Sequence, residues 1–113
     1  MAQLTVNSVV AAGLAASGTF DTPEIGGDTF VNRGDLRTFL AVDNQSASPV
    51  TLTVTTPTTL DGMAVADRAV VVPAGQMVFV GPFKASTYNQ ADEQVGFVLS
   101  AITDVTVAVF KVG

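Results

Sequence analysis

The sequence predicts an all-β protein: a single-domain antiparallel β-sandwich of about seven or eight strands, with a jelly-roll or another Greek-key-like order. Three observations support this prediction. Short β-branched and aromatic runs recur along the chain, turn-forming Pro, Gly, Asn and Asp residues separate them, and no segment has a convincing helical period. The 113 residues suffice for one domain, in which residues 1–27 form an N-terminal arm or edge segment with a loop and residues 28–113 form the sandwich.

The first 19 residues carry no charge and are rich in Ala, Ser, Thr and Gly. Their large apolar side chains are Leu4, Val6, Val9, Val10 and Leu14. Gly13 and the flanking Ser and Thr residues weaken any helix over residues 9–16. We therefore expect an extended arm or an edge strand over residues 4–10, followed by irregular chain.

Residues 21–28 contain a proline and paired glycines and are predicted to form a loop, followed by a short strand over residues 29–32. Arg33-Gly34-Asp35 then turns the chain. These three residues also spell an adhesion tripeptide, but so short a match is frequent by chance, and a charged turn explains it.

Two strands are predicted over residues 36–44 and 50–56. The first has bulky groups in both phases, which indicates that both of its faces are covered. The second alternates strictly, with Val50, Leu52 and Val54 facing inward and threonines facing outward. Because the turn over residues 44–49 is too short for a parallel crossover, we expect these strands to form an antiparallel pair.

A β-hairpin is predicted next, because the apolar runs 69–72 and 77–80 flank Pro73-Ala74-Gly75. Gly81-Pro82 ends its second arm, since proline cannot donate to a ladder. Both arms are apolar in both phases, so we expect the hairpin at the centre of the sandwich. The last two strands are predicted over residues 94–101 and 105–112, after a polar loop.

Composition argues against several classes of function. The chain has no cysteine and no histidine, so it lacks disulfides, the usual zinc ligands and the commonest general base. We expect no enzyme activity, no catalytic residue, no cofactor and no metal. A net charge of −5 with five Lys and Arg residues argues against nucleic acid, and no uncharged apolar run is long enough to predict a membrane span. Only 13% of residues are charged and 48% are hydrophobic, which favours a docked or oligomeric state.

Two groups of residues have a functional and a structural interpretation. The loop carboxylates Asp61, Asp67, Asp92 and Glu93 could offer oxygens to a hard cation, but their spacing matches no EF-hand, and solvated turn residues are the better interpretation. Phe83 and Tyr88 could form a platform for a sugar or a partner. We expect instead that they seal one end of the core, with the Tyr88 hydroxyl in water.

The segment from Val54 to Gly75, with Pro-Thr-Thr-Leu-Asp-Gly-Met and Ala-Asp-Arg-Ala-Val-Val-Val-Pro-Ala-Gly, continues to Gly81-Pro82-Phe83 and Tyr88-Asn89. Together with residues 38–44 and 100–107, it resembles small virion proteins of tailed bacteriophages and prophages over about residue 29 to the C-terminus. The resemblance implies a capsid decoration, or cement, protein: a small β-sandwich, often a homotrimer, that binds the major capsid protein on the outside of the head. It also implies synthesis in the host bacterial cytoplasm and a final location in the virion.

On this hypothesis each subunit bridges capsid subunits and buries apolar area there. Leu4, Val6, Val9, Val10 and Leu14 are the candidate capsid- or partner-binding residues, because a flexible arm with scattered apolar groups becomes ordered only against a partner. The alternative is that residues 4–10 form an edge strand of the sandwich. Rival functions are another virion part, such as a head–tail connector or tail component, and a surface carbohydrate-binding module.

Overall fold

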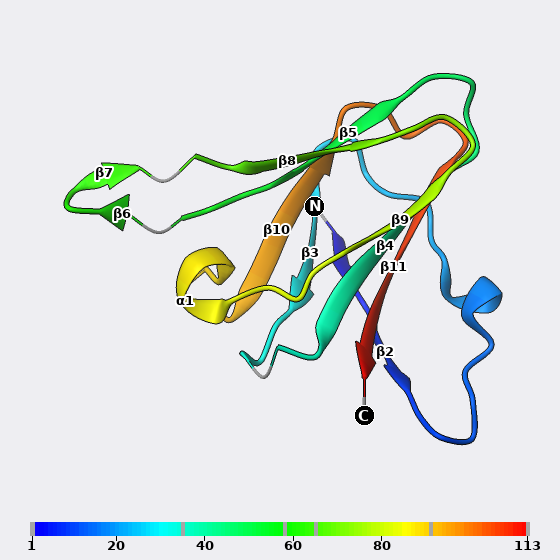
Figure 1. The fold of residues 1–113 in the computed structure, drawn as a ribbon, viewed down its shortest axis with the longest axis horizontal. Helices are drawn as coiled ribbons and strands as arrows, with labels where there is room; N and C mark the ends of the chain where they lie inside the picture. The colour runs from blue at the N-terminus through cyan, green and yellow to red at the C-terminus, as the bar shows by residue number, and fades with distance from the viewer. Residues whose placement is uncertain (1, 35, 58, 65, 91, 113) are drawn as a thin grey trace.

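The computed structural model describes residues 2–34, 36–57, 59–64, 66–90 and 92–112, and it confirms the predicted β-sandwich. Two sheets pack face to face (Figure 1). Sheet I contains, in spatial order, β1 (Ala2–Leu4), β3 (Asp28–Val31), β10 (Gln94–Leu99), β5 (Val50–Val54) and β8 (Arg68–Val72). Sheet II contains β2 (Val6–Val9), β11 (Val105–Val112), β4 (Thr38–Asn44) and β9 (Met77–Val80).

One core lies between the two sheets. It consists of inward-facing residues of both sheets: Phe30, Leu40, Val42, Val50, Leu52, Val54, Val72, Val80, Phe83, Val95, Phe97, Leu99, Val105, Val107 and Val109. The alternation predicted for β5 is confirmed, since its three apolar side chains are buried and Thr51 and Thr53 are not. Along β11, Val105, Val107 and Val109 face the core, so the even-numbered residues of this strand face outward.

Most of the short connections cross from one sheet to the other. The chain passes from β3 in sheet I to β4 in sheet II and back to β5, and later from β10 to β11. The predicted antiparallel pairing of residues 36–44 with 50–56 is therefore wrong: β4 pairs with β9 and β11, and β5 pairs with β8 and β10. The link between β4 and β5 forms an arch instead of a hairpin, because five residues easily span the separation of about 10 Å between packed sheets.

The predicted central hairpin is wrong for the same reason. Its turn is confirmed, with Gly75 at a φ of 72° and the Gln76 amide donating to the Pro73 carbonyl at 3.2 Å. Its arms, however, are β8 and β9, which pair with different sheets and lie at the edge of each. Each arm therefore has an uncovered face, on which Val71 and Phe79 are exposed.

The N-terminal residues join both sheets. β1 runs parallel to β3 at the edge of sheet I, and after Thr5 the chain enters sheet II, where β2 runs parallel to β11. These parallel pairs add to a sandwich whose other pairings are antiparallel in the described part of the chain. The alternative, an edge strand over residues 4–10, is therefore close to the structure, which has two edge strands, β1 and β2, one in each sheet.

A finger formed by the small hairpin β6 (Thr59–Leu60) and β7 (Met63–Ala64) extends from the sandwich between β5 and β8 (Figure 1). Asp61 and Gly62 form its turn with positive φ angles. At its base, Asp67 Oδ1 accepts hydrogen bonds from the backbone and the hydroxyl of Thr56, at 2.9 and 3.0 Å. Helix is limited, in the described residues, to the single turns η1 (Ala16–Thr19) and α1 (Ala85–Tyr88).

Candidate interaction surface

The outer face of sheet II carries aromatic side chains, whereas a sheet face that is open to solvent usually carries polar ones. The outward-facing residues of β4 and β11 include Phe39, Ala41, Ala108 and Phe110, while the paired residues Asp43 and Thr106 are polar. The strand register places Phe110 beside Phe39, and Phe79 of β9 beside Ala41. These side chains form a second apolar cluster that is separate from the core between the sheets.

Four phenylalanine rings form a continuous row across this face, which we call the aromatic row. Ring centroids are 5.5 Å apart for Phe79 and Phe39, 5.5 Å for Phe39 and Phe110, and 6.0 Å for Phe110 and Phe20. These are favourable tilted or edge-to-face contacts. Exposure increases from Phe110, which is buried, through Phe39, which is half-buried, to Phe79, which is 66% exposed; Phe20, at the other end of the row, is half-buried.

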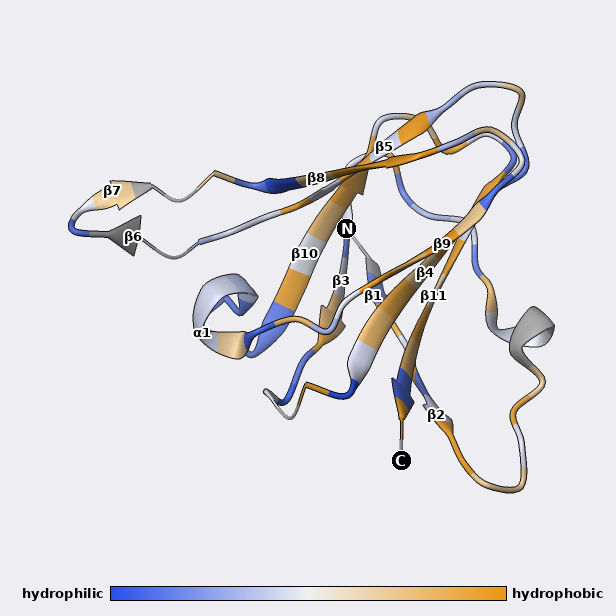
Figure 2. Ribbon diagram, in the orientation of Figure 1, coloured by the Kyte–Doolittle hydropathy of each residue, from blue (hydrophilic) through white to orange (hydrophobic). Residues whose placement is uncertain are grey.

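Two apolar hollows flank the contact between Phe39 and Phe79. One, of about 190 Å³, is bounded by three rings of the aromatic row, Phe39, Phe79 and Phe110, together with Val9 and Leu14. The other, of about 460 Å³, lies toward Leu36, Pro82 and Val112. Figure 2 shows the apolar residues that run along β4, β9 and β11. The described surface therefore offers grooves and an exposed ring together, which is the form of a protein-docking site.

Gly81 allows this arrangement. Its φ is +139°, and a Cβ there would lie 2.9 Å from the Cβ and 3.0 Å from the Cα of Phe39. A side chain at this position would separate the end of β9 from β4 and displace Phe39. The residue that ends the strand also sets the spacing of the two most accessible rings.

The outer face of sheet I is different. Strand β5, between β10 and edge strand β8, presents Thr51 and Thr53, and the large apolar side chains exposed around them are Val71 and Val98. Val71 lies on edge strand β8 and is 61% exposed, nearly as much as Phe79 on edge strand β9. This pair of positions provides a matched comparison between the two faces.

The structure distributes the five N-terminal candidate residues over three environments. Leu4 and Val6 pack against the core between the sheets, and Val9 and Leu14 pack against the cluster around Phe110. Val10 is about half exposed. Sequence reasoning missed Phe39, Phe79 and Phe110. Apolar residues in both phases of residues 36–44 and 77–80 were the available signal, but we interpreted them as burial on both faces.

Phe83 and Tyr88 seal one end of the core, as predicted. Phe83 is buried against Phe30 and Tyr88, with ring centroids 5.4 and 5.5 Å away. The Tyr88 hydroxyl accepts a hydrogen bond from Arg68 Nε at 2.9 Å at the exposed rim. Because Phe83 is buried, it offers no flat face for a sugar.

The loop carboxylates have separate roles. Asp67 closes the base of the finger, Asp61 lies in its turn, and Glu93 pairs with Arg33 at 3.5 Å. Among the described residues, no group of three or more metal-ligating side chains comes together. Asp35 of the adhesion-like tripeptide lies outside the described residues.

A scan against protein-family models, a search of curated proteins and a search of solved structures each return no match to this chain. In the part of the chain that the structure describes, no helix has the length and apolar character needed to span a bilayer.

Proposed function

We propose that this chain is a capsid decoration protein of a tailed bacteriophage, which docks on the major capsid protein at the outer surface of the head and stabilises it. The observation that carries the proposal is the aromatic row, which ends in Phe79 on an open sheet face. The sequence resemblance to small virion proteins suggests the major capsid protein as the partner that covers this face. The low fraction of charged residues fits a subunit that is docked when it functions.

The proposed mechanism transfers the docking role from a free arm to the face of sheet II. Residues 2–9 are tied into both sheets, so the N-terminal candidates take part only where they border the aromatic row, at Val9 and Leu14. Each subunit would bury exposed apolar area across a seam between capsid subunits, and separating those subunits would expose it again. Many copies on one lattice add their contributions.

A pair of aspartate substitutions tests the proposal. Phe79→Asp places a charge on the proposed docking face, and Val71→Asp does the same at an equally exposed edge position of the other sheet. Each full-length variant is mixed with expanded heads of the phage that encodes it and sedimented. We expect Phe79→Asp to remain in the supernatant and Val71→Asp to sediment like the unmodified chain. Equal sedimentation of both variants would refute docking through the aromatic row.

The same preparations address self-association, for which the resemblance implies a homotrimer. Light scattering of the free protein gives its mass, and a mass that falls to that of one chain in Phe79→Asp alone would assign the aromatic row to a second copy instead of the capsid. Electron microscopy of the free protein separates a head–tail connector or tail component, which would assemble into rings or tubes, from a decoration protein. We do not favour a carbohydrate-binding role through Phe83, because that ring is buried.

A further inference from the structure

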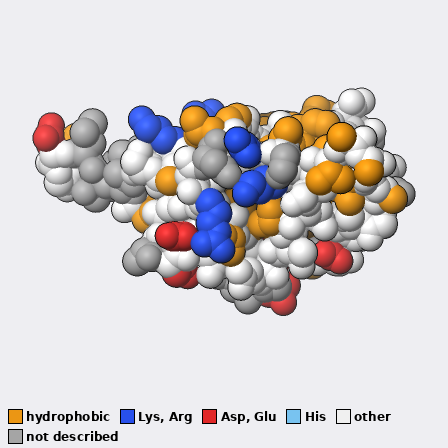
Figure 3. All heavy atoms as spheres, turned by 90° about the horizontal axis from the view of Figure 1, so that it is seen from below, with side chains coloured by type: hydrophobic (Ala, Val, Ile, Leu, Met, Phe, Trp, Pro, Cys, Tyr) orange, Lys and Arg blue, Asp and Glu red, His pale blue; other side chains and the backbone are white. Residues whose placement is uncertain are grey.

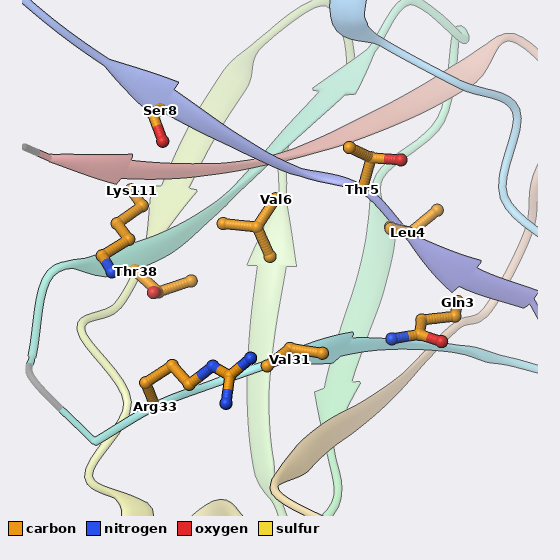
Figure 4. A pocket seen from close by; sticks show the side chains of 9 residues that line it. All are labelled: Gln3, Leu4, Thr5, Val6, Ser8, Val31, Arg33, Thr38 and Lys111. Atoms are coloured by element: carbon orange, nitrogen blue, oxygen red, sulfur yellow. The ribbon is translucent and has the colours of Figure 1, made fainter.

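A second candidate site lies where the chain leaves β1 for β2, at the end of the sandwich seen from below in Figure 3. Here a cavity of about 490 Å³ opens between the sheets. Its lining includes the polar side chains of Ser8, Arg33, Thr38 and Lys111 (Figure 4). We call it the Arg33–Lys111 cavity. Figure 3 shows lysine and arginine side chains gathered on this side of the molecule.

The wall formed by sheet II is a polar row across three strands. Lys111 of β11 is paired in register with Ser8 of β2 on one side and with Thr38 of β4 on the other, so the three side chains project to the same side. Lys111 follows Val105, Val107 and Val109 in the core-facing phase of its strand. The sequence therefore places an ammonium group where the pattern would continue with another apolar residue.

The opposite wall of the cavity carries the guanidinium group of Arg33. Figure 4 shows the Arg33 side chain reaching into the cavity from the end of β3. The residue before it, Asn32, is fully buried and firmly held: its amide donates to the Glu93 carbonyl at 2.9 Å, and its Nδ2 donates to the Phe83 carbonyl at 2.9 Å and to Asn89 Oδ1 at 2.8 Å. The backbone that carries Arg33 is thus fixed, although the guanidinium group itself lies in solvent.

Charge selects the class of ligand. Two of the chain's five Lys and Arg residues line this cavity, and none of the lining residues that the structure describes is acidic, in a protein of net charge −5. The carboxylate of Glu93, 3.5 Å from Arg33 Nη1, belongs to an exposed ion pair, which competes only weakly for the guanidinium group. Leu4, Val6 and Val31 supply apolar wall beside the cations, and this favours an anion with a short aliphatic body over a bare inorganic ion.

We propose that the Arg33–Lys111 cavity binds a carboxylate on a short aliphatic chain, either a free dicarboxylate or a glutamate side chain of a peptide. The Arg33 guanidinium group provides a planar pair of donors, and the Lys111 ammonium group and the hydroxyls of Ser8 and Thr38 provide the rest. This site lies at the end of the sandwich and does not depend on docking through the aromatic row.

The test is an NMR titration of the full-length 15N-labelled chain with glutarate and, separately, with acetyl-Ala-Glu-Ala-amide. We expect saturable chemical-shift changes at Ser8, Arg33, Thr38 and Lys111, with a Kd in the millimolar range that increases with added salt. Binding of glutarate alone identifies a free dicarboxylate, and equal or tighter binding of the peptide identifies a glutamate side chain. The neutral glutaramide should cause no such shifts. Shifts caused equally by glutaramide, or by inorganic phosphate but not by either carboxylate, would overturn the proposal.

Substitutions locate the site. Because Arg33 is exposed, Arg33→Gln should leave the fold intact and weaken glutarate binding by at least about tenfold. Lys111→Met should have the same effect and Lys111→Arg should restore binding, whereas Lys84→Met removes an exposed cation outside the cavity and should change nothing. Unchanged binding in Arg33→Gln would show that Arg33 does not hold the ligand, and an equal loss in Lys84→Met would show general charge attraction. Either result would contradict the proposal.

Discussion

Truncating Phe79 to alanine separates a docking role from a folding role. The side chain is 66% exposed, so the fold gains little from it. Taking about 200 Å² for a whole phenylalanine, roughly 70 Å² is buried in the free subunit, and losing that buried area costs about 1–2 kcal/mol of unfolding free energy. The remaining area, roughly 130 Å², would be buried on docking and would contribute about 3 kcal/mol per copy.

Those magnitudes give different results in two assays. Urea unfolding should show a small loss of stability for Phe79→Ala, whereas Phe110→Ala, which empties the buried centre of the aromatic row, should cost about 3–5 kcal/mol. In a binding titration with expanded heads, about 3 kcal/mol corresponds to roughly a hundredfold weaker affinity for Phe79→Ala. A Phe79→Ala protein that is as unstable as Phe110→Ala, yet binds heads normally, would refute the reasoning.

Two further predictions concern positions that the fold requires. Gly81→Ala should lower the unfolding free energy by more than about 2 kcal/mol, because it adds a Cβ 2.9 Å from that of Phe39 at a φ of +139°. The control Gly26→Ala, where an added Cβ meets nothing within 4 Å, should change the unfolding free energy by less than about 1 kcal/mol. Equal urea midpoints for the two variants would contradict this account. Asn44→Ala should lower the unfolding free energy by about 2–4 kcal/mol, because the buried Asn44 Nδ2 donates to the Ser48 and Val72 carbonyls at 2.9 and 3.1 Å. Gln45→Ala, at the exposed neighbouring position, should lower it by less than about 1 kcal/mol. A similar loss of stability for both variants would contradict a structural role for the Asn44 hydrogen bonds.

The sequence predicts the class of fold well because strand and turn signals are local. Strict alternation in residues 50–54, the turn at Pro73-Ala74-Gly75 and the strand end at Gly81 are all confirmed. Pairing is not local. A connection of five residues is long enough either to reverse a strand within one sheet or to cross to the other sheet, so the sequence does not distinguish the arch between β4 and β5 from a hairpin.

The candidate surface was missed for a related reason. Apolar residues in both phases of a strand indicate that both faces avoid water, but they do not say what covers the second face. In β4 and β9 that face carries Phe39 and Phe79 and remains open in the free subunit. The Arg33–Lys111 cavity has no sequence signal at all, because Ser8, Thr38 and Lys111 meet only through the register of three strands.

Cryo-electron microscopy of the parent head carrying the bound protein tests the central claim most directly. The account predicts that the outer face of sheet II lies against the major capsid protein, with the Phe79 ring buried at the contact. A decorated head in which the aromatic row faces solvent and another surface holds the subunit would contradict it.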